Sequence, residues 1–163
     1  MWFYSDKDLT NSFWGPNQPD KRPGNKNDCG VMVAHLDSFW WEDTNCLVPN
    51  FQDKVVATIC QYDTAADSTT TTTEASAATT TAVEVCAGWE IFEGHCYLNT
   101  GNVNTWYNAT EDCNNRGGFL ATVHSEAENK FISSLASAYF MWIGASDIQE
   151  EARILFFSHS FTT

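Results

Sequence analysis

The chain has 163 residues, of which 43% are hydrophobic and 14% aromatic, and it carries a net charge of −13. This length suits one domain or one and a half, and the apolar fraction is enough to bury a core. The acidic surplus excludes nucleic acid as a partner, because contacts to phosphate need lysine and arginine. No stretch approaches the roughly 18 apolar residues of a membrane-spanning helix, so no transmembrane segment is expected.

The cysteine content indicates the cellular compartment in which the protein is found. Their number is even, they form no C-x-x-C pair, and no histidine stands at zinc-ligand spacing from them. This usage is typical of disulfides in an oxidising environment. The N-terminus shows neither the basic start nor the apolar core of a signal peptide. The chain is therefore interpreted as a fragment of a longer secreted protein, located outside the cell.

Side chains with oxygen donor atoms gather around a loop that a disulfide between Cys29 and Cys46 could close. Calcium takes about six to eight oxygen ligands and mixes carboxylates with amide carbonyls, whereas zinc prefers cysteine and histidine. The pattern predicts a calcium site. The alternative interpretation is a solvated surface loop. The candidate ligands are three carboxylates and two amides: Gln18, Asp20, Asn27, Glu42 and Asp43.

Two features of local geometry are expected from this site. Gln18 and Asp20 flank Pro19, and a cis Gln18–Pro19 bond is predicted because it would turn both side chains toward one ion. Glu42 and Asp43 are neighbours, and neighbours in a regular strand point to opposite faces. At least one of them is therefore expected at a strand end or a bulge.

The rest of the chain falls into two structured segments and a linker. Alternation after Cys29 predicts a strand, and the apolar run before Cys60 predicts a buried final strand. Residues 63–85 are rich in Thr, Ser and Ala without an apolar face, so they are expected to form an extended linker.

The second segment begins with a hairpin. Its turn is expected at Glu93-Gly94, and Cys86 and Cys96 are close enough in sequence to staple it. A helix capped by Thr105 is expected to run to about residue 116. A second helix is expected to open at a capping box that starts with Ser125.

The loop residues resemble the calcium and sugar site of C-type lectin domains. The order is QPD, then a polar residue before Asp-Cys, then Trp-x-Asp followed three residues later by Cys. The family's usual pattern is EPN or QPD, then Glu-Asp-Cys, then Trp-Asn-Asp. Two positions depart from it reciprocally, Asn27 for Glu and Glu42 for Asn, so the number of carboxylates is unchanged. The resemblance implies Ca2+ as the cofactor, the five candidate ligands and the Asp43 main-chain carbonyl as its ligands, and sugar contacts from Gln18, Asp20, Asn27 and Glu42.

The resemblance also covers the second segment, but in an unusual order. Residues 1–62 resemble the C-terminal half of such a domain, and residues 86–163 resemble a truncated N-terminal half of a second one. The family's fold implies an α+β chain with two helices, small antiparallel sheets and disulfide staples. In the family the helix cysteine pairs with the cysteine of the last strand, so Cys113 is expected to pair with Cys60 if the two halves assemble as one circularly permuted domain. Two truncated tandem domains are the alternative. The residues carrying the resemblance of the second segment are Trp106, Ala109, Cys113, Gly118, Leu120, Ala121, Ser125, Glu128, Asn129, Phe131, Trp142, Ile143 and Gly144.

The resemblance implies calcium-dependent binding of a carbohydrate or glycoprotein. QPD favours galactose-type sugars, although Lys21 and its neighbours stand where galactose binders of the family commonly place a Trp. The alternative function is calcium-independent recognition of a protein surface. An enzyme is not expected, because no histidine belongs to an HExxH motif or lies near G-x-S-x-G. Asn108 begins an N-glycosylation sequon.

Overall fold

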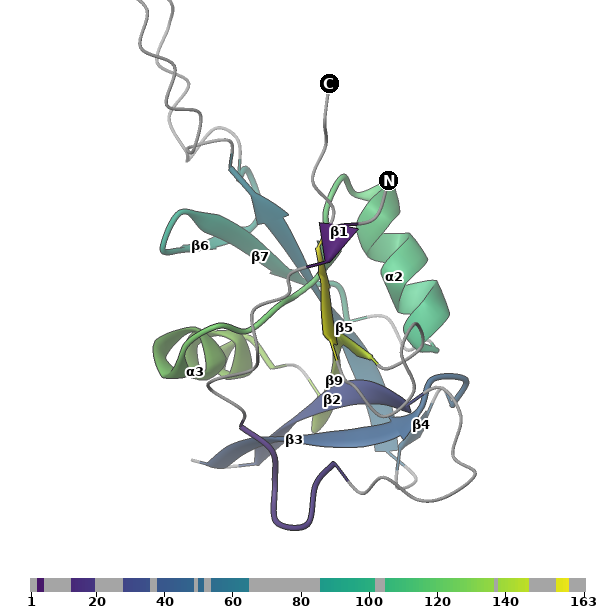
Figure 1. Ribbon diagram of the computed structural model, residues 1–163. Helices are drawn as coiled ribbons and strands as arrows, with labels where there is room; N and C mark the ends of the chain where they lie inside the picture. Colours follow the sequence, from purple (N-terminus) through teal and green to yellow (C-terminus); the bar gives the residue numbers. More distant parts are fainter. Residues whose placement is uncertain are drawn as a thin grey trace, which may run out of the picture.

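The computed structural model of the chain describes residues 3–4, 13–19, 28–35, 38–48, 50–51, 54–64, 86–101, 105–136, 138–146 and 155–158. Figure 1 shows the arrangement of its elements. The described helices are α2 (Trp106–Asn115) and α3 (Glu126–Ser134). The described strands are β1 (Phe3–Tyr4), β2 (Asp28–His35), β3 (Ser38–Asn45), β4 (Asn50–Phe51), β5 (Lys54–Asp63), β6 (Glu90–Phe92), β7 (His95–Asn99), β8 (Phe119–Leu120), β9 (Phe140–Ser146) and β10 (Leu155–Ser158).

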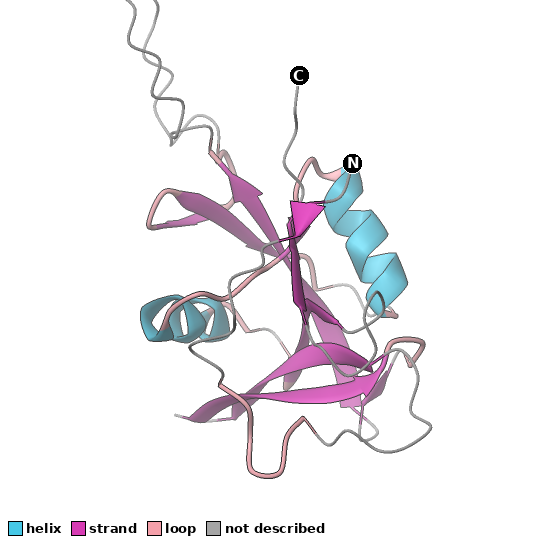
Figure 2. Ribbon diagram, viewed as in Figure 1, coloured by secondary structure: helices cyan, strands magenta, loops and turns pink. Residues whose placement is uncertain are grey.

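Strand β5 joins the two segments of the chain into one sheet. It comes from the first segment, yet it pairs in parallel with β9 and antiparallel with β7 and β8 of the second. Strand β2, also from the first segment, pairs with both β3 and β9. Helices α2 and α3 lie on opposite sides of β5 (Figure 2). The described residues therefore form a mixed sheet flanked by helices, which confirms the expected α+β class.

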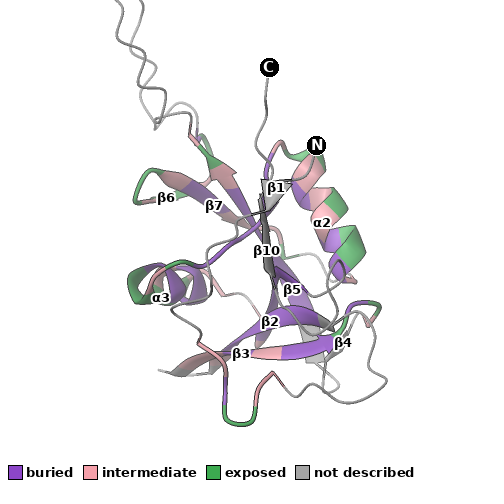
Figure 3. Cartoon of the chain, in the orientation of Figure 1, coloured by how far each residue is buried: buried purple, intermediate pink, exposed green. Residues whose placement is uncertain are grey.

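The buried core draws on both segments as well. Ile59 of β5 and Trp41 of β3 pack in one apolar cluster with Ile132 of α3. A second cluster combines Val56 with Trp142 and with residues of α2. Figure 3 shows buried residues along β2, β5 and β9, while the outer faces of the helices are exposed. Neither segment thus encloses these clusters without the other.

Helix α2 begins and ends where the local sequence predicts. The Thr105 hydroxyl accepts a hydrogen bond from the N–H of Asn108 at 3.3 Å, which caps the first turn. Gly117 follows the helix with φ of 84°, a conformation that favours glycine. The buried side chains recur at helical spacing: Trp106, Ala109 and Cys113.

Helix α3 begins with the predicted cap, in a modified form. The Ser125 hydroxyl accepts from the N–H of Glu128 at 3.0 Å. The Glu128 carboxylate accepts from the N–H of His124, whereas in a standard capping box it would accept from the N–H of Ser125.

The predicted hairpin is also present. Strands β6 and β7 pair through Phe92 and His95, with the turn residues Glu93 and Gly94 at φ of 48° and 85°. Positive φ at both turn residues is the arrangement that matches the twist of a two-residue hairpin.

Three disulfides link the described residues, and they are the expected pairs. Cys29 of β2 bonds to Cys46, which directly follows β3, and Cys86 bonds to Cys96 of β7. The third bond joins Cys60 of β5 to Cys113 of α2. It connects the two segments covalently across a sequence separation of 53 residues.

Candidate functional site

The candidate site forms where residues 13–19 run beside strand β3. Trp14 and Trp41 form a parallel bridge, and the N–H of Trp41 donates to the carbonyl of Phe13 at 2.7 Å. The carbonyl of Trp41 in turn accepts from the N–H of Gly15 at 2.9 Å. This segment therefore occupies the edge of β3 that β2 leaves open.

A tight turn then presents Gln18 to the same edge. The N–H of Gln18 donates to the carbonyl of Gly15 at 3.0 Å, and Asn17 within the turn has φ of 63°. The Gln18–Pro19 peptide bond is cis, as the sequence predicts.

The side chain of Gln18 lies next to Asp43. Its Oε1 atom accepts from the main-chain N–H of Asp43 over 3.5 Å, and Asp43 is only 7% exposed. Because residues 41 and 43 of a strand direct their N–H groups to the same edge, the turn and the Gln18 side chain extend one pattern of contacts along β3. The side chain of Gln18 is thus brought beside the main chain of Asp43, another of the predicted ligands.

Glu42 lies on a half-buried position of β3 and is held by a neighbour that the sequence did not single out. The indole Nε1 of Trp40 donates to its Oε1 atom at 2.8 Å. The signal available in the sequence was the spacing, because residues i and i+2 of a strand share a face.

The expectation of a strand end or bulge at Glu42 or Asp43 was wrong. Both residues lie inside β3, paired in regular register with Val31 and Gly30 of β2. The irregularity lies instead in the pairing of β2 with β9, between Cys29 and Val31. Glu42 and Asp43 therefore leave opposite faces of the strand, as neighbours in a regular strand do.

Two predicted ligands, Asp20 and Asn27, lie outside the described residues. Within the part of the chain that the structure describes, no cluster of three or more His, Cys, Asp or Glu side chains could hold a metal ion. The described contributors Gln18, Glu42 and Asp43 offer oxygen atoms only. That donor set fits calcium and does not fit zinc.

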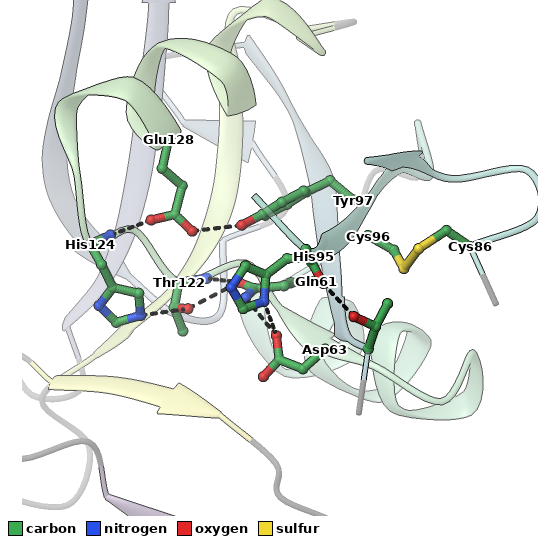
Figure 4. Close-up of polar contacts among 11 residues, drawn as sticks. Gln61, Asp63, Cys86, His95, Cys96, Tyr97, Thr122, His124 and Glu128 are labelled. Carbon is green, nitrogen blue, oxygen red and sulfur yellow. Dashed lines mark hydrogen bonds and ion pairs between the residues drawn. A yellow bond between two sulfur atoms is a disulfide. The ribbon is translucent and has the colours of Figure 1, made fainter. Parts of the chain in front are cut away.

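A second polar cluster links helix α3 with strands β5 and β7 (Figure 4). Its centre is Glu128, only 6% exposed, whose carboxylate accepts from the Tyr97 hydroxyl and from the His124 N–H, each at 2.6 Å. Burial, and then the hydrogen bond and charge of Glu128, raise the pKa of Tyr97 well above its ordinary value. Both Glu128 oxygens thus have protein donors, so this carboxylate holds structure together.

The same cluster continues to the surface through Gln61. Its Oε1 atom accepts from the N–H and the hydroxyl of Thr122, at 2.9 and 3.0 Å. Its Nε2 atom donates to Asp63 at 3.0 Å, and Asp63 pairs with His95 at 2.7 Å. Since Gln61 and Asp63 belong to β5, these contacts tie the first segment to the second.

The remaining predicted modification site lies on α2. Asn108 is exposed near the start of the helix, and the Thr110 hydroxyl of the sequon donates to the carbonyl of Trp106 at 2.9 Å. Glycosylation of Asn108 stays a prediction. Among the described residues, no helix combines the length and the apolar character needed to cross a membrane.

These features define a disulfide-stapled α+β domain in which residues 13–19 run beside β3. Comparison with known proteins gives the family: the model of the lectin C-type domain matches residues 102–160. Residues 102–160 thus match a lectin C-type domain, and over most of its length the chain is similar to a protein that carries such domains. No solved structure matches the chain with significance.

Relatives of the chain include several lectins. C-type mannose receptor 2 of Mus musculus is 28% identical over 151 residues, which cover 91% of this chain and 10% of the relative. Lectin BRA-3 of Megabalanus rosa is 38% identical over 65 residues, covering 39% of this chain and 40% of the relative. Lactose-binding lectin l-2 of Anguilla japonica is 38% identical over 65 residues, covering 39% of each chain. The chain spans a tenth of the length of the first of these relatives and less than half of the other two.

Proposed function

We propose that the chain binds carbohydrate through a calcium ion held beside β3. The observation that carries the proposal is the contact of the Gln18 side-chain oxygen with the main chain of Asp43, directly next to Glu42. This contact brings an amide oxygen from one stretch of the sequence beside two neighbouring carboxylate residues from another, and calcium prefers oxygen ligands of these kinds. The proposed ligands are Gln18, Asp20, Asn27, Glu42 and Asp43.

The proposed chemistry uses the coordination shell of the ion. Calcium takes more ligands than five side chains supply, so two neighbouring sugar hydroxyls can complete its shell. The remaining hydrogen bonds of those hydroxyls go to Gln18, Asp20, Asn27 and Glu42. Carboxylate oxygens accept from the hydroxyl protons, while the amides can also donate. The site therefore suits a pair of adjacent hydroxyls on one sugar ring.

The preferred sugar is proposed to be of the galactose type. The support is the sequence Gln18-Pro19-Asp20 and the likeness to a lectin whose name states that it binds lactose, a disaccharide that ends in galactose. The likeness to a mannose receptor supports the competing preference. The chain is proposed to act outside the cell, in a secreted or cell-surface protein that binds a carbohydrate or glycoprotein, and its disulfides support this location.

The domain boundaries are part of the proposal. We retain residues 1–62 and 86–163 as parts of two C-type lectin domains with residues 63–85 as the linker. The match over 91% of the chain supports this division, since it takes in residues of both segments in the same order as in the mannose receptor. The shared sheet and the Cys60–Cys113 bond support assembly of the two segments into one permuted unit.

Chromatography on immobilised sugars tests the function. The chain should be retained on galactose in the presence of calcium, released by a chelator, and retained less on mannose. The Asp43→Ala variant should pass through, while Asp63→Ala, which removes an exposed carboxylate of the second polar cluster, should be retained like the wild type. Retention that persists in chelator would instead favour calcium-independent recognition of a surface.

A further inference from the structure

The structure assigns Trp40 as a positioning residue of the proposed calcium site, an inference that rests on the proposed function. Trp40 touches both parts of the site that are described: the carboxylate of Glu42 and the turn that carries Gln18. Trp40 does not offer an oxygen ligand, so its effect on an ion must pass through the residues it holds.

The first contact fixes one oxygen of Glu42. The indole N–H donates to Oε1 at 2.8 Å in a half-buried position, where a charge-assisted hydrogen bond is strong. An indole nitrogen carries a single donor and no acceptor, so the bond has one sense only. This bond limits the rotation of the Glu42 carboxylate, and with Oε1 held in place the direction of Oε2 is fixed as well.

The second contact lies at Gly15. A methyl group placed on this glycine would come within 2.5 Å of the Trp40 ring carbon Cδ1 and 3.0 Å of its Nε1. The indole therefore lies directly against the main chain of the turn, and the absent side chain of Gly15 makes the close approach possible. The carbonyl of the same Gly15 accepts from the N–H of Gln18. Trp40 thus packs against the turn that carries Gln18 and at the same time bonds to Glu42.

The orientation of Trp40 is itself imposed by the strand. Its neighbour Trp41 is fully buried on the opposite face of β3 and donates to Asn129 of α3 at 3.0 Å. Because successive side chains alternate, anchoring Trp41 on the core side directs Trp40 and Glu42 together to the other side. C-type lectin domains usually have Asn at the position of Glu42. The carboxylate that replaces it here accepts a hydrogen bond from the indole of Trp40, two residues earlier.

A double-mutant cycle on calcium affinity tests the assignment in the full 163-residue chain. Trp40→Phe keeps a ring over Gly15 and removes the N–H donor. Calcium affinity, measured from the calcium-dependent rise in the unfolding midpoint, should fall about tenfold, the typical effect of one hydrogen bond to a charged group. In the Glu42→Ala background the same change should have no further effect, because the acceptor is gone.

Trp89→Phe is the matched control. Trp89 is also partly buried, but it lies beside Tyr62, outside the candidate site, and its substitution should leave calcium affinity unchanged. The unfolding midpoint without calcium should change little in Trp40→Phe. If that variant does not fold, Trp40→Tyr serves as the second substitution that removes the indole donor.

The possible results separate this inference from the proposed function. If Glu42→Ala loses calcium and Trp40→Phe binds as tightly as the wild type, the assignment of Trp40 is overturned while the calcium site stands. The assignment would also be overturned if Trp40→Phe lowered calcium affinity by the same factor in the Glu42→Ala background as in the wild type. A folded wild type that shows no response to calcium would overturn both.

Discussion

The domain contains two groups of carboxylates that differ in what surrounds them. Glu128, in the cluster of Figure 4, faces a hydroxyl and a main-chain N–H, both at 2.6 Å. Near Glu42 and Asp43, the approaching side chain of Gln18 directs its oxygen toward β3. Glu128 thus has both oxygens bonded to donors of the protein, whereas Glu42 and Asp43 lie beside a turn that brings in a further oxygen-bearing side chain.

This difference separates a structural role from a binding role. A buried carboxylate with two protein donors needs no other partner, and removing it leaves those donors unpaired. In the proposed calcium site, the oxygen atoms of Gln18, Glu42 and Asp43 act through the ion that they bind. Substitutions in the first group should therefore act on stability without calcium, and substitutions in the second should act on the response to calcium.

The largest effect is expected for Glu128→Ala. It would leave the Tyr97 hydroxyl and the His124 N–H without their acceptor in the interior, so the free energy of unfolding should fall by about 4 kcal/mol. Urea denaturation in chelator measures the change. Glu126→Ala, an exposed carboxylate of the same helix, should have little effect. Equal losses from both variants would contradict the structural role of Glu128.

Asp43→Asn should abolish most of the calcium response while retaining the shape of the side chain. In the wild type, calcium at about 100 times its dissociation constant should raise the free energy of unfolding by about 2.7 kcal/mol. In the variant, less than half of this gain should remain at the same concentration, and the stability in chelator should be nearly unchanged. Thermal unfolding with and without calcium measures both. An undiminished gain would remove Asp43 from the site.

Tyr97→Phe should cost about 2 kcal/mol, less than Glu128→Ala, because Glu128 keeps its bond from the His124 N–H. The measurement is again urea denaturation at neutral pH. The calcium response of this variant should equal that of the wild type. A loss of calcium response would show that the two groups of carboxylates are coupled.

Tyr97 also predicts a dependence on pH. Burial and Glu128 raise its pKa in the folded chain, while the unfolded chain has the ordinary value near 10. Above about pH 10 the unfolded chain loses a proton that the folded chain retains, so this residue lowers stability by about 1.4 kcal/mol per pH unit. The stability difference between the wild type and Tyr97→Phe should therefore narrow between about pH 10 and 11. A constant difference would contradict the raised pKa.

The smallest effect is expected for Asp63→Asn. Its pair with His95 is exposed, with side-chain accessibilities of 42% and 48%, so solvent screens most of the attraction. The free energy of unfolding at neutral pH should fall by less than about 1 kcal/mol. A much larger loss would mean that the link from Gln61 to the surface contributes as much as the buried bonds of Glu128.

Local features of the fold were readable from sequence. The caps Thr105 and Ser125 and the turn Glu93-Gly94 depend on residues within three or four positions, and all three are where the pattern placed them. The Cys60–Cys113 pair depended on the family resemblance, because a pairing across 53 residues leaves no local signal.

The contacts of the candidate site were only partly predictable. The cis bond before Pro19 was predicted from the motif. The regular pairing of Glu42 and Asp43 with β2 was not predicted, because where a strand ends depends on its partner strand. The bond from Trp40 to Glu42 required knowing which face of β3 is held by the core. The bond from Tyr97 to Glu128 joins residues 31 positions apart and has no pattern in the sequence.

Calorimetric titration of calcium, followed by galactose, tests the central claim most directly. The wild-type chain should bind one calcium ion at the site beside β3 and should give heat with galactose only after calcium is added, and Asp43→Ala should give neither heat. A chain with intact near-ultraviolet circular dichroism that gives no calcium heat, or binds sugar equally well in chelator, would contradict the account.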